Sequence, residues 1–96
     1  MSRKVTRTIR EAFLARSRKT VGNTSTDGDS VYLHGNEIVR RNPASGEVFI
    51  RTAGWNTPTT RERIKAFTDF PVYQKRGQLY IGEKEWNGDW ISATNP

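Results

Sequence analysis

The chain has 96 residues, no cysteine, a net charge of +6 and an apolar content of 33%. This length allows one domain with a modest core, in which aromatic side chains supply much of the buried area. The lack of cysteine excludes disulfides, thiol nucleophiles and zinc–thiolate sites. No run approaches the ~20 apolar residues that span a membrane, and the N-terminus has no signal-peptide pattern, so we expect a cytoplasmic protein with no membrane contact.

The positive charge is concentrated near the N-terminus. Residues 1–19 contain seven basic residues and one acidic residue, which gives +6, whereas residues 20–96 contain nine of each and cancel. A local positive field of this kind favours an anionic partner for the N-terminal segment.

An amphipathic helix is predicted over residues 4–20. Val5, Ile9 and Phe13 recur at helical spacing and form an apolar stripe. The opposite side is basic and carries Arg3, Arg7, Arg10 and Arg18. The Gly-Asn pair at residues 22–23 supplies the expected stop, and cations near this end suit the helix dipole.

Residues 22–30 are small or polar and predict a loop. Three antiparallel strands are expected next, at residues 30–34, 37–42 and 47–52. Gly35-Asn36 is the tight-turn signal between the first two of them.

A second helix is predicted over residues 59–68, ending before the next proline. Thr57 with Pro58 fits an N-cap followed by proline at the first helical position, and Thr59 with Glu62 fits a capping box instead. A last hairpin is expected from strands at residues 72–75 and 78–82.

The predicted order is α-β-β-β-α-β-β, an α+β fold with helices packed on an antiparallel sheet. We expect a single domain over residues 1–96, with its ordered part at about 5–86. The tail at 87–96 has no clear period and could be flexible. The expected core residues are Ile9, Phe13, Phe49, Ile64 and Phe67.

Several segments together resemble small, mostly uncharacterised proteins of tailed bacteriophages. They are Val21–Gly28, Val31–Asn36, Gly54–Ile64 and Gln74–Tyr80. The likeness spans about residues 7–86, and Gly-Trp-Asn-Thr-Pro-Thr-Thr-Arg-Glu-Arg is its most specific part. It implies an infected bacterial cell as the setting and carries no catalytic residue with it.

Chemical motifs are weak throughout the sequence. His34 is the only histidine, so one chain offers no histidine pair for metal or acid–base chemistry. Asp27-Gly28-Asp29 lacks the rest of a calcium loop, and residues 22–30 lack the Lys and Gly spacing of a phosphate-binding loop. We therefore expect no enzyme, no metal and no cofactor.

The strongest functional signal is basic. The candidate ligands of an anionic partner are Arg3, Lys4, Arg7, Arg10, Arg18, Lys19, Arg61 and Arg63. Closely spaced cations bind nucleic-acid phosphates by releasing counterions, so nucleic acid is the leading partner, contacted with little base readout. The alternative is a host bacterial protein with an acidic surface.

The presence of each candidate residue could also be explained within the fold, without an external partner. The basic helix could be solvated, or covered by the acidic residues Glu83, Glu85 and Asp89 of the C-terminal part. Arg61 and Arg63 lie in the first turns of a helix, where cations oppose the dipole, so an ion pair with Glu37 or Glu47 is expected ahead of an external phosphate. The aromatic side chains that could stack on bases are expected mainly in the core: Tyr32, Trp55, Tyr73 and Tyr80.

Overall fold

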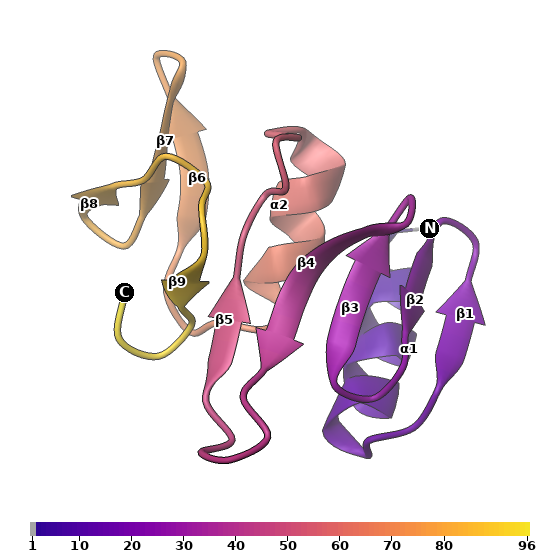
Figure 1. The fold of residues 1–96 in the computed structure, drawn as a ribbon. Helices are drawn as coiled ribbons and strands as arrows, with labels where there is room; N and C mark the ends of the chain where they lie inside the picture. The colour runs from indigo at the N-terminus through magenta and orange to yellow at the C-terminus, as the bar shows by residue number, and fades with distance from the viewer. Residues whose placement is uncertain (1) are drawn as a thin grey trace.

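The computed structural model describes residues 2–96, with side chains from residue 4 onward. Helix α1 (Ser2–Leu14) and helix α2 (Pro58–Lys65) pack against the inner face of an antiparallel sheet (Figure 1). Arg3 lies in α1, but its side chain is outside the described residues. The α+β class and the antiparallel pairing predicted from the sequence are confirmed.

Two sheets are present among the described residues. The larger has the order β1-β2-β3-β4-β5-β9 and the smaller β6-β7-β8. The larger sheet consists of β1 (Lys19–Val21), β2 (Thr24–Thr26), β3 (Ser30–Leu33), β4 (Asn36–Arg41), β5 (Val48–Ile50) and β9 (Ile91–Ser92). The smaller consists of β6 (Val72–Lys75), β7 (Gln78–Ile81) and β8 (Lys84–Glu85).

Helix α1 is shorter than predicted and ends at Leu14, not near residue 20. Arg16 adopts a left-handed conformation (φ 55°), and the amide of Ser17 donates to the carbonyl of Ala12 at 2.8 Å. The amide of Arg16 donates to Phe13 at 3.1 Å, which completes a Schellman cap. The chain therefore turns back six residues early, with arginine where glycine is usual.

Residues 19–26 form the β1–β2 hairpin, so the prediction of a helix end followed by a loop is wrong here. Gly22 supplies the positive φ of 59° that a two-residue turn needs. Thr24 and Thr26 are buried against the core, whereas Ser25 between them is only half-buried. Their branched side chains suit a strand, although their polarity suggested a loop.

A buried arginine stabilises the C-terminal end of α1 from across the sheet. Arg41 of β4 is 8% exposed, and its guanidinium lies 4.0 Å from the centroid of the Phe13 ring. Its Nη2 donates to the carbonyl of Phe13 at 2.8 Å, and its Nη1 donates to the carbonyl of Gly28. The positive charge that suits the helix dipole thus comes from β4, because the basic residues after Leu14 have left the helix.

The core lies between the helices and the inner face of the larger sheet. Its buried apolar residues include Ile9, Phe13, Val31, Leu33, Ile38, Val39, Ile50 and Ile64. Phe67 is half-buried and packs edge-on against Phe13 at 5.2 Å between ring centroids. The assignment of Phe49 to this core is wrong: Val48 and Ile50 face inward, so the strand alternation turns Phe49 to the other face.

The β3–β4 turn is at His34-Gly35, one residue earlier than predicted. Both residues have positive φ, 52° and 81°, as a type I′ turn requires. A bulge opposite Val31 and Tyr32 then lets Ile38 and Val39 both face the core.

The start of helix α2 matches the first of the two predicted capping patterns. Thr57 is the N-cap, its side chain accepts from the amide of Thr60 at 3.1 Å, and Pro58 follows it. The helix ends at Lys65, a few residues before the predicted end.

The C-terminal segment packs on the rest of the molecule. Trp86 and Ala93 are buried, and β9 pairs with β5. The carbonyl of Gly88 (φ 87°) accepts from the amide of Thr52 at 2.9 Å, and an added Cβ at Gly88 would collide with the Thr52 hydroxyl. Among the described residues, no helix has the length and apolar character needed to cross a membrane.

Candidate nucleic-acid interface

The exposed side of α1 carries three of the predicted cations. Lys4, Arg7 and Arg10 are exposed, whereas Ile9 and Phe13 on the same helix are almost fully buried. Burial of the apolar stripe fixes the orientation of the helix and leaves its basic side toward solvent. Arg10 has a second role, because its Nε donates to the carbonyl of Ala66 at the end of α2, at 2.9 Å.

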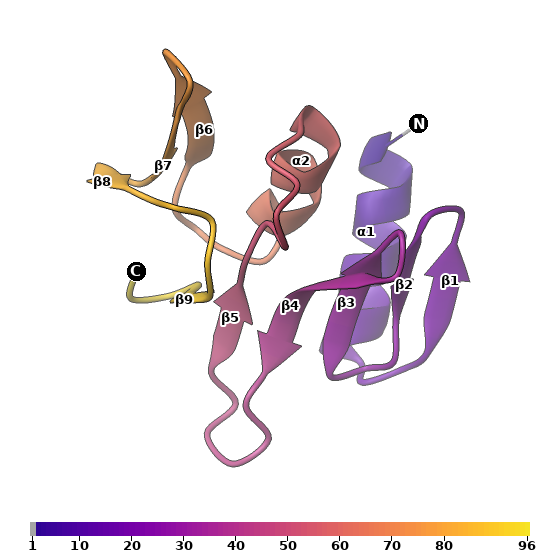
Figure 2. The same cartoon turned by 45° about the horizontal axis from the view of Figure 1, so that its top comes forward.

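These cations have no acidic partner in the part of the chain that the structure describes. No carboxylate there lies within 4.0 Å of the five exposed candidates, which are Lys4, Arg7, Arg10, Arg18 and Lys19. Glu83 and Glu85 do not cover α1: Glu83 precedes β8 and Glu85 lies in it, and β8 pairs with β7 on the far side of α2 (Figures 1 and 2). The basic side of α1 is therefore open.

Arg18 and Lys19 lie apart from this helical side, contrary to the prediction. Both are exposed, but Arg18 is in the connection after α1 and Lys19 begins β1. The backbone amide of Asp29 lowers the pKa of Asp27, with a smaller contribution from the charge of Arg18. The carboxylates of Asp27 and Asp29 therefore offset part of the positive field at this end, and the excess is strongest along Lys4, Arg7 and Arg10.

Arg63 is a structural residue. Only 4% of it is exposed; its Nε donates to Thr24 at 2.9 Å, and its Nη1 donates to Thr6 at 3.0 Å and to Glu62. Arg63 thus connects α2 with β2 and α1. An internal ion pair was the favoured explanation, but the partner is the adjacent Glu62 and not Glu37 or Glu47.

Arg61 does not join the basic side of α1 either. It is half-buried, and its Nη1 donates to the side chains of Asn56 at 2.7 Å and Gln74 at 2.9 Å. Glu62, the next residue, faces Thr6 of α1. Arg61 therefore points toward β6, and β6 lies across α2 from α1 (Figure 2).

The outer face of the larger sheet carries a second arginine cluster that the sequence analysis missed. Arg40 and Arg51 lie 4.5 and 4.6 Å from the Trp90 ring. Arg40 donates to Glu37 at 2.7 Å and thereby holds the pKa of Glu37 below its ordinary value, and Ser30 donates to the same carboxylate. These cations are already paired within the fold, so they are weaker candidates for phosphate than those of α1.

The aromatic residues are more exposed than expected. Trp55 is 59% exposed and Tyr73 is 37% exposed, so their assignment to the core is wrong. Tyr73 stacks on Tyr80 at 5.3 Å across the β6–β7 pair, and Tyr32 is half-buried on the outer face of the larger sheet. Trp55 has no such aromatic partner among the described side chains.

Acid–base and metal chemistry find little support in this geometry. His34 is exposed in the β3–β4 turn, and within the described residues no three His, Cys, Asp or Glu side chains are grouped as metal ligands would be. The open cations of α1 remain the most distinctive charged feature.

The sequence matches the family described as Kyanoviridae Gp96 protein over residues 2–95. The chain belongs to this family. The family consists of cyanophage proteins, which confirms the resemblance to tailed-bacteriophage proteins. No curated protein and no solved structure is significantly similar to the chain.

Proposed function

We propose that this phage protein acts by binding nucleic acid, without catalysis, in the cytoplasm of the infected bacterium. The contacts are to phosphates and come from the exposed side of α1, chiefly Lys4, Arg7 and Arg10. Arg18 and Lys19, which follow the helix and lie apart from this side, are additional candidate contacts.

The observation that supports the proposal is that these cations are exposed and have no acidic partner among the described residues. They are held on a helix whose other side is buried, and no described carboxylate lies within 4.0 Å of Lys4, Arg7 or Arg10. An open row of cations releases counterions when it meets a phosphate backbone, and that release drives binding. The α+β fold supports the row but does not by itself indicate a partner.

A double variant tests the proposal. Lys4→Gln/Arg7→Gln removes two charges without breaking any described hydrogen bond, whereas Arg10→Gln would also lose the bond to Ala66. We expect weaker binding to every duplex sequence and a log–log salt slope flatter by about two, measured by fluorescence anisotropy.

The matched control is Lys75→Gln/Lys84→Gln. It makes the same change in charge at exposed positions of β6 and β8, on the far side of α2. Equal losses of affinity in both double variants would mean that net charge, and not the α1 surface, governs binding.

A host protein with an acidic surface is the second candidate. Leu14 is 58% exposed on α1 and lies beside Arg10 along a groove that the residues after α2 also line. An apolar residue next to cations favours a protein interface. Salt separates the two candidates, because phosphate binding weakens steeply with salt and an interface with an apolar centre weakens less.

A further inference from the structure

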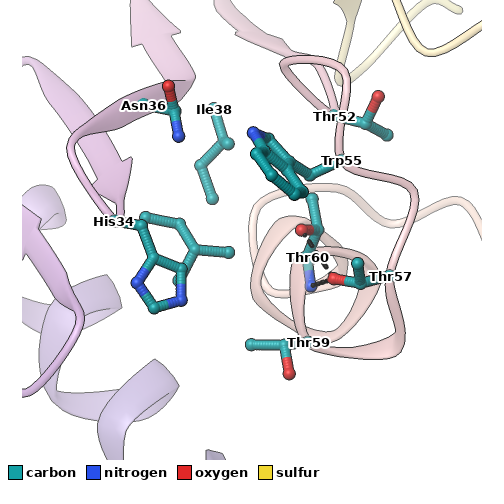
Figure 3. Close-up of a pocket in the computed structure, with 9 residues that line it drawn as sticks. His34, Asn36, Ile38, Thr52, Trp55, Thr57, Thr59 and Thr60 are labelled. Atoms are coloured by element: carbon teal, nitrogen blue, oxygen red, sulfur yellow. Dashed lines mark hydrogen bonds between the residues drawn. The ribbon is translucent and has the colours of Figure 1, made fainter.

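A cleft lies between the β3–β4 turn and the loop that leads into α2. Its volume is about 570 Å³, its floor includes Leu33 and Ile38, and Trp55 forms one wall (Figure 3). Leu33 and Ile38 are 5% and 1% exposed, so the floor belongs to the core, whereas the indole of Trp55 is open to solvent. Two of the segments that resemble phage proteins, 31–36 and 54–64, meet here.

Trp55 is held in place by its backbone. Its amide donates to the carbonyl of Thr52 at 3.0 Å, and its own carbonyl accepts from the amide of Thr57 at 3.0 Å. Ala53 and Gly54 before it both have positive φ, 56° and 83°, and for alanine this conformation costs about 1 kcal/mol. The exposed indole of Trp55 gains little from burial in this strained turn, and its position there suggests a ligand.

Polar groups with spare hydrogen-bonding capacity border the cleft on both sides, Asn36 from β4 and Thr59 from α2. The side chains of Asn36 and Thr59 make no hydrogen bond with any described residue, and Figure 3 shows both at the border of the cleft. His34 faces the cleft from the β3–β4 turn, with its Nε2 3.5 Å from the side-chain Nδ2 of Asn23. An aromatic wall together with a free carboxamide is suited to a planar heterocycle that has donors and acceptors on its edge.

The charged side chains lie outside the cleft and not in its lining. None of its lining residues is Lys, Arg, Asp or Glu, so the cleft itself selects a neutral group. Helices α1 and α2 run parallel, because Thr6 contacts Glu62 and Arg10 contacts Ala66. The N-terminal end of α1, with Lys4, therefore lies at the same end of the molecule as the α2 N-terminus that borders the cleft (Figures 1 and 2).

We infer that this cleft takes an unpaired nucleobase, stacked on Trp55, while the adjoining phosphates run toward the basic side of α1. This inference rests on the proposed function and makes single-stranded nucleic acid the preferred ligand. Each part of the site suits one part of this ligand. The neutral aromatic cleft suits the base, and the cations near it suit the phosphate backbone.

The test compares two single strands that differ only in their bases. One is oligothymidylate of about 12 nucleotides and the other is an abasic strand of the same length. Wild type should bind oligothymidylate about tenfold more tightly than the abasic strand, and Trp55→Ala should remove that preference. Lys4→Gln/Arg7→Gln should weaken the binding of both strands and keep their ratio.

Tryptophan fluorescence gives a second readout. Oligothymidylate should quench wild type and Trp90→Phe, whereas Trp55→Phe should lose this quenching and keep its fold, because Trp55 is exposed. Equal affinity for both strands with no quenching from Trp55 would overturn the base site and leave phosphate binding intact; the cleft would then suit a protein partner. No binding of either strand at low salt would overturn both proposals.

Discussion

At the scale of single residues, the two arginines of α2 have opposite surroundings although they are two positions apart. Arg63 is buried among Thr6, Thr24 and Glu62, whereas Arg61 bonds to polar side chains near the surface. Sequence position alone made them equivalent candidates for an anionic partner. Burial assigns Arg63 to stability.

Substituting Arg61 and Arg63 one at a time should change the free energy of unfolding by different amounts. Arg63→Gln should lower the free energy of unfolding by about 3 kcal/mol, since it removes the donor to two buried hydroxyls and the charge paired with Glu62. Arg61→Gln should cost less than about 1 kcal/mol, because its contacts are partly solvated. Urea unfolding followed by circular dichroism measures both, and an equal cost for the two would contradict the assigned burial.

Glu37 gives the fold a dependence on pH. Its pKa is held below the ordinary value near 4.5, first by the hydrogen bond from Arg40, with Ser30 also donating. As the pH falls, the unfolded state takes up the proton before the folded state does. The stabilisation from Glu37 is therefore present above about pH 4.5 and is lost as the pH drops through the folded pKa.

The difference in stability between wild type and Glu37→Gln should accordingly shrink between pH 6 and pH 3. Urea midpoints at several pH values in this range test it. A constant difference across the range would mean that the Glu37 carboxylate is not stabilised by its neighbours.

At the scale of elements, the end of α1 determines where the basic residues lie. The Schellman cap at Arg16 ends the helix at Leu14 and directs residues 19–21 into a strand. A positive φ at arginine costs roughly 1 kcal/mol, and the ion contact with Asp29 at 3.9 Å between exposed groups offsets little of it.

Arg16→Gly should therefore raise the thermal midpoint, by a free energy of up to about 1 kcal/mol. Arg16→Ala, which keeps the Cβ, serves as the control and should not gain this stability. Calorimetry on both variants measures the effect, and equal midpoints would argue against left-handed strain at this position.

At the scale of the whole molecule, elements with a hydrophobic period were predictable, whereas strands with polar buried positions or with only two residues were not. The hydrophobic pattern predicted both helices, the strands β3 to β5 and the β6–β7 hairpin. It missed the β1–β2 hairpin, whose buried positions are threonines, and β9, which has two residues and is fixed only by pairing with β5. Such strands depend on tertiary contacts more than on local propensity.

The candidate site, like the fold, could be predicted from the sequence only in part. Amphipathic spacing correctly placed Arg7 and Arg10 on the exposed side of a helix, but it placed Arg18 there too, which lies beyond the helix end. The burial of Arg63 depends on hydroxyls 57 and 39 residues away in the chain, and no local pattern reports such partners. The exposure of Trp55 depends likewise on the turn before it, which a sequence rich in aromatic residues does not reveal.

The salt dependence of duplex DNA binding by the wild-type protein is the most direct test of the central claim. With three or four phosphates contacted by the α1 surface, log affinity should fall with log salt concentration at a slope of about −3. Anisotropy titrations from low to moderate salt provide this slope. A slope near zero, or no binding to any DNA or RNA at low salt, would contradict the account.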